Sequence, residues 1–189
     1  MWSRIAAVLV LVFVVACVAE RNQPTAAPST SLEPQTGTAV PGETPTSPDL
    51  VVVRALTEFA RRPSAAALAA VPLADTVEVG LGDSIVSVRA SGDLVRADAW
   101  MLRRAPFHGR VGPFSALELL ASDPPIAVTV GPHPHCASPP VPAPAAFAAF
   151  RQVSVQPTGV DTCLLWWTVD LFVSPSGRIA AITLDLWDP

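Results

Sequence analysis

The strongest constraint on the fold is a pair of apolar segments near the C-terminus, separated by a short turn. CLLWWTVDLFV begins at residue 163, RIAAITLDLW begins at residue 178, and the turn between them reads SPSG. Proline and glycine at these places favour a tight reversal of the chain. Because apolar residues alternate along both segments, they predict a β-hairpin.

Pairing Val173 with Arg178 gives the expected register of this hairpin. Beyond that first pair, one face is wholly apolar, whereas the other is mixed and includes Asp170 and Asp185. A sheet covered by helices on one side requires such an asymmetry. The two aspartates are then four residues out of step, about 13 Å along the strands. Because glycosidase carboxylates lie roughly 5–9.5 Å apart, we interpret these two as exposed surface residues.

Upstream patterns predict helices and further strands. Apolar residues recur at helical spacing after Ser47, which we take as the N-cap, and Gly82-Asp83 is typical of a hairpin turn. Ser115 and Glu118 have the spacing of a capping box. The expected helices cover 49–61, 65–70, 116–121 and 145–151, and the expected strands cover 76–81, 84–89, 97–104 and 126–130.

These elements predict an α+β domain over residues 48–189. An N-terminal helix and short helices would pack on an antiparallel sheet that ends in the C-terminal hairpin. The order of one helix followed later by strands, with a closing hairpin that contains Trp167-Thr168-Val169-Asp170, resembles cystatin-like or nuclear-transport-factor-2-like folds. That resemblance implies a fold only, because such folds carry many functions.

The N-terminal segment predicts where the protein is located. Arg4 precedes an apolar run of eleven residues, 5–15, which suits a secretory signal and is too short to span a bilayer. The run ends in Val14-Val15-Ala16-Cys17, which resembles the lipobox of bacterial lipoprotein precursors. The resemblance implies a signal peptide over 1–16 and a Cys17 that carries diacylglycerol and acyl chains such as palmitate. It thus implies a protein anchored to the cell membrane on its extracytoplasmic face.

Residues 17–47 predict a tether between the lipidated cysteine and the domain. They are rich in Pro, Thr, Ser and Ala and hold almost no large apolar side chains. Such a segment buries too little surface to offset its ordering entropy, so we expect a disordered spacer. Without residues 1–17 the chain has 11 arginines against 16 acidic residues, a net charge of −5. No basic footprint for nucleic acid is present, so nucleic acid is not an expected partner.

The remaining cysteines, Cys136 and Cys163, are expected to pair in an exported protein. The disulfide would stabilise the fold by roughly 3 kcal/mol on the chain-entropy model. An alternative is an extracytoplasmic metal-binding lipoprotein, because His133 and His135 lie beside Cys136 in the sequence HPHC. Copper and zinc accept imidazole and thiolate ligands. A disulfide at Cys136 would remove the thiolate, so the sequence favours a structural loop and no metal or other cofactor.

The leading functional hypothesis is binding rather than catalysis. The sequence holds no G-x-S-x-G, S-x-x-K, P-loop or dinucleotide-binding glycine motif, so it predicts no catalytic residue. Trp166 and Trp187 are candidates to line a groove, although cover by helices would explain them equally well. The expected partners are the membrane, through the lipid, and another envelope protein or a small ligand. An envelope enzyme with a site built from scattered residues is a further alternative.

Overall fold

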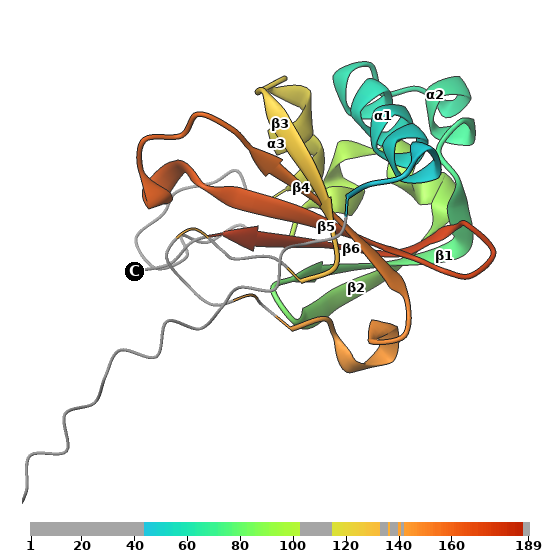
Figure 1. Ribbon diagram of the computed structural model, residues 1–189. Coiled ribbons are helices and arrows are strands. Elements are labelled where there is room, and N and C mark those ends of the chain that lie inside the picture. Colours follow the sequence, from blue (N-terminus) through green and yellow to red (C-terminus); the bar gives the residue numbers. More distant parts are fainter. Residues whose placement is uncertain (1–43, 103–114, 133–135, 137–139, 141, 187–189) are drawn as a thin grey trace, which may run out of the picture. The chain divides into compact units, whose positions relative to one another are not determined.

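A six-stranded mixed sheet forms the centre of the computed structural model, with strand order β2-β1-β6-β5-β4-β3 (Figure 1). The structure describes residues 44–102, 115–132, 136, 140 and 142–186, all within one compact unit, 38–189. Its strands are β1 (Leu73–Leu81), β2 (Ser84–Ala90), β3 (Ile126–Val130), β4 (Arg151–Pro157), β5 (Trp167–Val173) and β6 (Ile179–Leu186).

Short helices accompany the sheet, which confirms the predicted α+β class. Most of them precede β3 in the chain, and none in the described part is long and apolar enough to cross a membrane. The α-helices are α1 (Ser47–Arg61), α2 (Ala65–Ala69) and α3 (Ala116–Ala121). The 3₁₀-helices are η1 (Ser91–Val95), η2 (Ala97–Trp100), η3 (Ala145–Phe147) and η4 (Cys163–Leu165).

The main core lies between the helical layer and one face of the sheet. Leu56 and Phe59 of α1 pack there with Trp100 and with Val169 of β5, and all four are at most 1% exposed. The indole N–H of Trp100 donates to the carbonyl of Leu94 at 2.7 Å, so its one polar group is satisfied. Burial of these large side chains supplies most of the driving force for folding.

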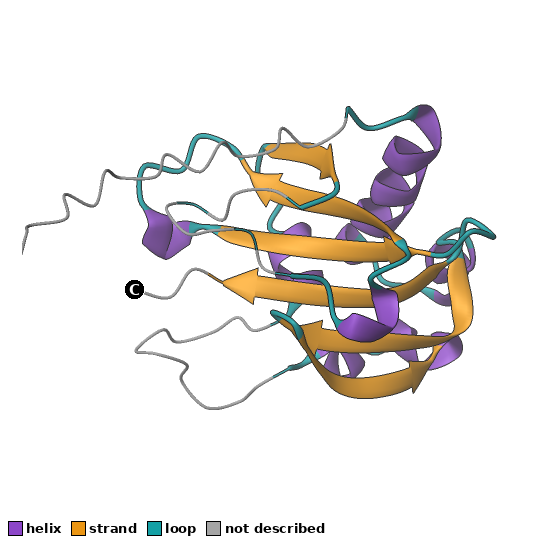
Figure 2. Ribbon diagram, turned by 60° about the horizontal axis from the view of Figure 1, so that its bottom comes forward, coloured by secondary structure: helices purple, strands orange, loops and turns teal. Residues whose placement is uncertain are grey.

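The opposite face of the sheet is also covered, by the segment around η3 (Figure 2). The ring of Phe147 lies 5.6 Å from that of Phe172 on β5, centroid to centroid, and Phe150 meets Phe147 edge-on at 5.2 Å. The expected helix over 145–151 is therefore wrong in part. It is a single 3₁₀ turn, and Arg151 already begins β4, a strand that the sequence pattern did not predict.

The sheet is not wholly antiparallel, because β1 and β6 run parallel. Glu78 pairs with Ala181 and Leu81 with Leu184 across this junction. Parallel strands need cover on both faces, and β6 has it, since six of its eight residues are buried. The C-terminal strand thus joins the β1–β2 hairpin to the β3–β5 strands in one sheet.

The C-terminal hairpin is confirmed, but its register differs by two residues from the predicted one. Val173 pairs with Ile179 after a bulge at Phe172/Val173, and the N–H of Ser174 donates to the carbonyl of Arg178 at 2.9 Å. Arg178 thus belongs to the turn rather than to the ladder. From Phe172 to Trp167, the two-residue shift keeps the side chains on their predicted faces, which is why the apolar pattern could not reveal it. At the bulge, Ile179 pairs with Val173 and joins the main core, although the predicted register placed it on the mixed face.

The strand expected over 97–104 is wrong in its described part. Residues 97–100 form the 3₁₀-helix η2, in which the N–H of Met101 donates to the carbonyl of Asp98 at 3.3 Å. Trp100 is fully buried there. The indole ring is buried under the helical layer and its N–H donates to the carbonyl of Leu94. Both interactions favour a compact turn over an extended strand here.

Candidate functional site

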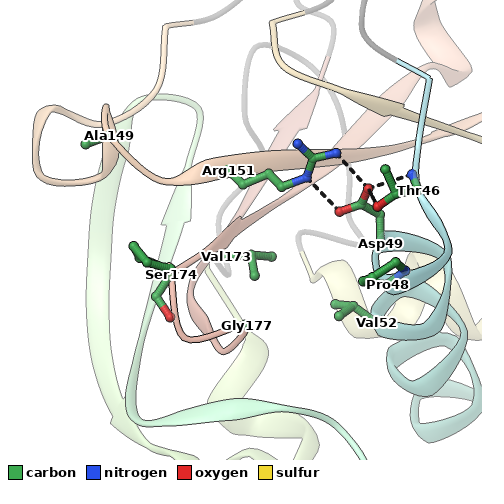
Figure 3. A pocket seen from close by; sticks show the side chains of 10 residues that line it. Thr46, Pro48, Asp49, Val52, Ala149, Arg151, Val173, Ser174 and Gly177 are labelled. Atoms are coloured by element: carbon green, nitrogen blue, oxygen red, sulfur yellow. Dashed lines mark hydrogen bonds and ion pairs between the residues drawn. The ribbon is translucent and has the colours of Figure 1, made fainter.

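An open hollow of about 430 Å³ lies where α1, the start of β4 and the β5–β6 turn meet (Figure 3). Apolar side chains form most of its walls, and one guanidinium and one carboxylate are the charged groups. The lining residues are Thr46, Pro48, Asp49, Val52, Ala149, Arg151, Val173, Ser174, Pro175 and Gly177.

Asp49 and Arg151 form a two-pronged ion pair beside this hollow. Arg151 donates from Nε to Oδ1 and from Nη2 to Oδ2 of Asp49, both at 2.8 Å. Thr46 donates to the same Oδ2 from its backbone N–H and from its hydroxyl, each at 2.7 Å. Four hydrogen bonds therefore satisfy a carboxylate that is only 5% exposed.

The hydrogen bond from Arg151 is the main reason that the pKa of Asp49 lies well below its usual range. Burial alone would raise this pKa, but the bonds from Arg151 and Thr46 outweigh that effect. Asp49 is thus held ionised, and its oxygens are fully used within the protein. A carboxylate in this state anchors the start of α1 and is a poor candidate for a general acid or base.

Local sequence explains why these side chains meet. Thr46, rather than the expected Ser47, is the N-cap of α1, so Asp49 occupies the third helical position, where a carboxylate reaches back to the cap. Arg151 is the first residue of β4 and lies beside the hairpin turn, because it pairs with Val173. Gly177 closes that turn with a φ of +78°, a conformation that favours glycine.

The hydroxyl groups near the hollow show no arrangement of a nucleophile with a base. The Oγ of Ser174 lies 2.9 Å from that of Ser176 and accepts from the N–H of Arg178 at 3.3 Å. No imidazole or thiol is among the residues that line the hollow. Its chemistry, apolar walls beside a half-exposed guanidinium, suits the binding of a ligand with an apolar body and a hydrogen-bond acceptor.

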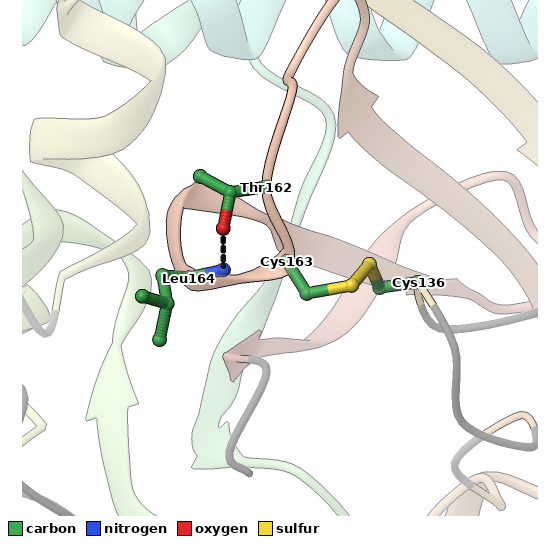
Figure 4. Close-up of a disulfide and its surroundings, with 4 residues drawn as sticks. All are labelled: Cys136, Thr162, Cys163 and Leu164. Carbon is green, nitrogen blue, oxygen red and sulfur yellow. Dashed lines mark hydrogen bonds between the residues drawn. A yellow bond between two sulfur atoms is a disulfide. The ribbon is translucent and has the colours of Figure 1, made fainter.

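The expected disulfide joins Cys136 to Cys163, with Cα atoms 5.7 Å apart (Figure 4). It ties the proline-rich loop after β3 to η4, whose first turn is capped by Thr162: its Oγ1 accepts from the N–H of Leu164 at 3.3 Å. The sulfur of Cys136 is thereby committed to a covalent bond and is not a thiolate ligand. His133 and His135 lie outside the described residues, so the metal-binding alternative stays a prediction.

Within the described ranges, no three His, Cys, Asp or Glu side chains gather closely enough to hold a metal ion. Trp166 is 7% exposed and offers little surface for a ligand. Trp187 and Cys17 lie outside the described residues. The groove between Trp166 and Trp187 and the lipid on Cys17 therefore stay predictions as well.

The sequence did not predict a row of polar side chains across the second face of the sheet. Thr129, Ser154, Asp170 and Thr183 stand in direct register on β3, β4, β5 and β6. The hydroxyl of Ser154 donates to Oδ1 of Asp170. Asp170 is only 6% exposed, which corrects the expectation of an exposed aspartate, because the residues of this face are covered.

Asp185 is opposite Thr168, so Asp170 and Asp185 are two residues out of step rather than four. That offset is about 7 Å along the strands and no longer excludes a glycosidase-like separation. Burial does argue against an open site here, since Asp170, Ser154 and Thr183 have little contact with solvent. The hollow at Arg151 is therefore the better candidate for a binding site.

Comparison with known proteins gives no match: no family model, curated protein or solved structure is similar to this chain. The resemblances to lipoprotein precursors and to cystatin-like or nuclear-transport-factor-2-like folds therefore stay predictions.

Proposed function

We propose that this chain is a lipid-anchored lipoprotein of a bacterial cell envelope, whose domain binds another envelope protein or a small ligand rather than catalysing a reaction. The observation that carries the proposal is the sequence Val14-Val15-Ala16-Cys17 at the end of an apolar run of signal-peptide length. Lipidation at a cysteine anchors a protein without a transmembrane helix, because acyl chains contribute roughly 0.8 kcal/mol for each buried methylene.

The disulfide supports an extracytoplasmic location. Structural disulfides persist in oxidising compartments and are rare in the reducing cytosol. Cys136 and Cys163 are 27 residues apart in sequence, and their bond ties the chain after β3 to η4.

We assign binding to the hollow at Arg151 because its charged groups are fixed before a ligand arrives. The Arg151 side chain is 37% exposed, and Asp49 holds its guanidinium through two hydrogen bonds. A preorganised donor beside apolar walls binds without first losing side-chain entropy.

Metabolic labelling tests the anchor. Cells that produce the full chain are grown with a labelled fatty acid, and the protein is then isolated from the membrane fraction. We expect label on the unmodified chain and none on Cys17→Ser, which should leave the membrane fraction. A Ser3→Ala variant, altered before the apolar run, is the matched control and should keep its label. An unlabelled wild-type chain would overturn the proposal.

A filled hollow tests the assignment of the binding site. Ala149→Trp places a large side chain in the hollow, whereas Ala121→Trp changes an exposed position at the end of α3. We expect envelope components that crosslink to the wild-type chain also to crosslink to Ala121→Trp, but not to Ala149→Trp. Equal crosslinking by both variants would exclude the hollow as the binding site.

A further inference from the structure

The outer face of α1 combines exposed apolar and basic side chains. Leu50 and Val51 are 44% and 62% exposed, among the most exposed large apolar side chains of the described part. At 100° per residue, Arg54 and Glu58 fall on the same side of the helix as these two, opposite the side that Val53, Leu56 and Phe59 bury in the core. Arg62 follows the last turn as the C-cap and is also exposed. We call Leu50, Val51, Arg54, Glu58 and Arg62 the outer face of α1.

The net charge of this face is positive, because its one carboxylate, Glu58, is paired with Arg61. Neither Arg54 nor Arg62 forms an ion pair or a side-chain hydrogen bond within the described part of the chain, and both are exposed. Between them in sequence, Arg61 donates to Glu58 at 3.2 Å and also pairs with Asp123, which follows the C-cap of α3. The charges of Arg61, Glu58 and Asp123 therefore largely neutralise one another. The two free arginines stand out in a chain that carries an excess of acidic residues.

This face begins where the proposed tether ends. The hydrogen bonds from Arg151 of β4 to Asp49 fix the first turn of α1 against the sheet, and Leu50 follows at once. Residues 18–45 would connect Cys17 to this point, and a flexible chain of that length spans roughly 30 Å. An anchored domain is therefore held within reach of the bilayer at the helix end that carries Leu50 and Val51.

We infer that the outer face of α1 rests on the anionic headgroups of the leaflet that holds the lipid anchor. The inference rests on the proposed function, because the tether provides the proximity. Arginines at the surface would contact lipid phosphates while Leu50 and Val51 enter the boundary between headgroups and acyl chains.

The net negative charge of the chain does not oppose this contact at physiological salt. Charges farther from the surface than about 8 Å are largely screened at that ionic strength, so the nearest residues decide the interaction. Each arginine near an anionic surface favours the docked state about fivefold, and two therefore favour it roughly 30-fold. This electrostatic contribution is modest, but it is sufficient for docking because the anchor keeps the domain at a high local concentration beside the membrane.

Depth measurement on the anchored chain tests the contact. The lipidated full chain carries a nitroxide on Val51→Cys, with Val88→Cys on β2, 58% exposed, as the matched control position. Vesicles contain either phosphatidylcholine alone or phosphatidylcholine with phosphatidylglycerol, and flotation shows that the chain is attached. With phosphatidylglycerol, we expect the label at 51 to gain access to oxygen and to lose access to an aqueous nickel complex, while the label at 88 stays in water.

Charge variants separate the proposed contact from other causes. Arg54→Gln with Arg62→Gln should lower the ratio of docked to free chain about 30-fold. Arg96 is an exposed arginine between η1 and η2, and Arg96→Gln should leave the ratio unchanged. A floating chain whose label at 51 stays as aqueous as that at 88 overturns the inference alone. Protection of 51 in native membranes but not on these lipid vesicles also overturns it, in favour of a protein partner. A chain that does not float overturns both this inference and the proposed anchor.

Discussion

At the scale of single residues, the Asp49–Arg151 pair connects the start of the first helix to a strand one hundred residues later. Asp49 is almost wholly buried, while the side chain of Arg151 keeps 37% of its surface exposed. Bidentate geometry and low exposure of the carboxylate make such a pair stronger than a surface salt bridge. The contact thus determines where α1 sits on the sheet and how the hollow is shaped.

Replacing Asp49 by Asn keeps the side-chain shape but removes the charge. We expect Asp49→Asn to lower the free energy of unfolding by about 2 kcal/mol, because hydrogen bonds to charged groups contribute about that much. Urea unfolding followed by tryptophan fluorescence measures the change. Asp98→Asn is the matched control, because Asp98 and its partner Arg96 are both exposed. Loss of this surface ion pair should lower the free energy of unfolding by less than about 0.5 kcal/mol. Equal effects of the two variants would contradict the anchoring role.

The lowered pKa of Asp49 also predicts a pH dependence of stability. In the unfolded chain this carboxyl has a pKa of about 3.9, and in the folded chain it is lower, so the folded state favours the ionised form. The stabilisation is complete above the unfolded pKa and is lost as the pH falls through the folded one. From about pH 5 to about pH 3, the free energy of unfolding should therefore fall less in Asp49→Asn than in the wild type. Parallel curves for the two proteins would show that Asp49 does not contribute to the pH dependence.

The sequence alone indicates only one member of the Asp49–Arg151 pair. Asp49 near the start of an amphipathic helix is a local signal, and the helix was predicted within two residues of its observed start. Its partner could not be predicted, because Arg151 was assigned to the end of a short helix and the contact spans 102 positions. Ser115 is a second example. It is the N-cap of α3 as expected, but its hydroxyl is buried without a hydrogen-bond partner in the described part, so the capping box is not formed there.

At the scale of elements, the β1–β2 hairpin depends on a glycine at its bulge. Gly80 pairs with Ile85, and a Cβ there would lie 2.6 Å from the carbonyl oxygen of Ser84 and 3.0 Å from the methyl group of Thr183. Backbone cannot move aside as a flexible side chain can. Gly80→Ala should therefore destabilise the protein by about 1–3 kcal/mol in thermal unfolding.

Gly92, in η1, provides a matched comparison for this substitution. Nothing lies within 4 Å of a Cβ added there. Gly92→Ala should change stability by less than about 0.5 kcal/mol. If Gly80→Ala and Gly92→Ala unfold at the same temperature, the close packing around Gly80 does not determine the stability of the protein.

The disulfide links η4 to the loop after β3. Joint replacement of Cys136 and Cys163 by serine should lower the free energy of unfolding by about 3 kcal/mol, because the unfolded chain regains loop entropy. Urea unfolding measures this loss, and the intact mass of the oxidised wild type should be two hydrogens below that of the reduced chain. Reductant should destabilise the wild type and leave the double variant unchanged. The absence of the mass difference would show that the two thiols do not pair.

Elements with strong local periodicity were predicted well, and those defined by distant neighbours were not. The hairpin over β1 and β2, α3 and β3 all follow from spacing and turn residues. β4 was not predicted, although Gln152, Ser154 and Gln156 alternate with apolar residues as in a half-buried strand; the three polar side chains are on the face where the polar row lies. Polar side chains in a covered strand need hydrogen-bond partners, and here these partners come from other strands. Gln156, for example, donates from Nε2 to the hydroxyl of Thr168 on β5 at 3.4 Å.

At the scale of the whole molecule, β6 holds two groups of strands together. It pairs in parallel with β1 and antiparallel with β5, so it separates the β1–β2 hairpin from the β3–β5 strands in the sheet order. Local signals predicted the β5–β6 hairpin, but nothing local indicated the parallel junction. Which earlier strand a C-terminal strand joins is decided by how the two apolar faces close over the core, a property of the complete chain.

The position of β6 predicts a cooperative failure when it is removed. A chain that ends at Gly177 lacks the strand that contributes the fully buried Ile179, Ile182 and Leu184, so the β1–β2 hairpin loses its only strand neighbour on that side. We expect this chain to lose its near-ultraviolet circular dichroism and its cooperative thermal transition. A chain that begins at residue 38 is the control and should keep both, because the compact unit covers 38–189. A cooperative transition in the chain that ends at Gly177 would mean that the two groups of strands fold independently, and β6 would then not be the element that unites the sheet.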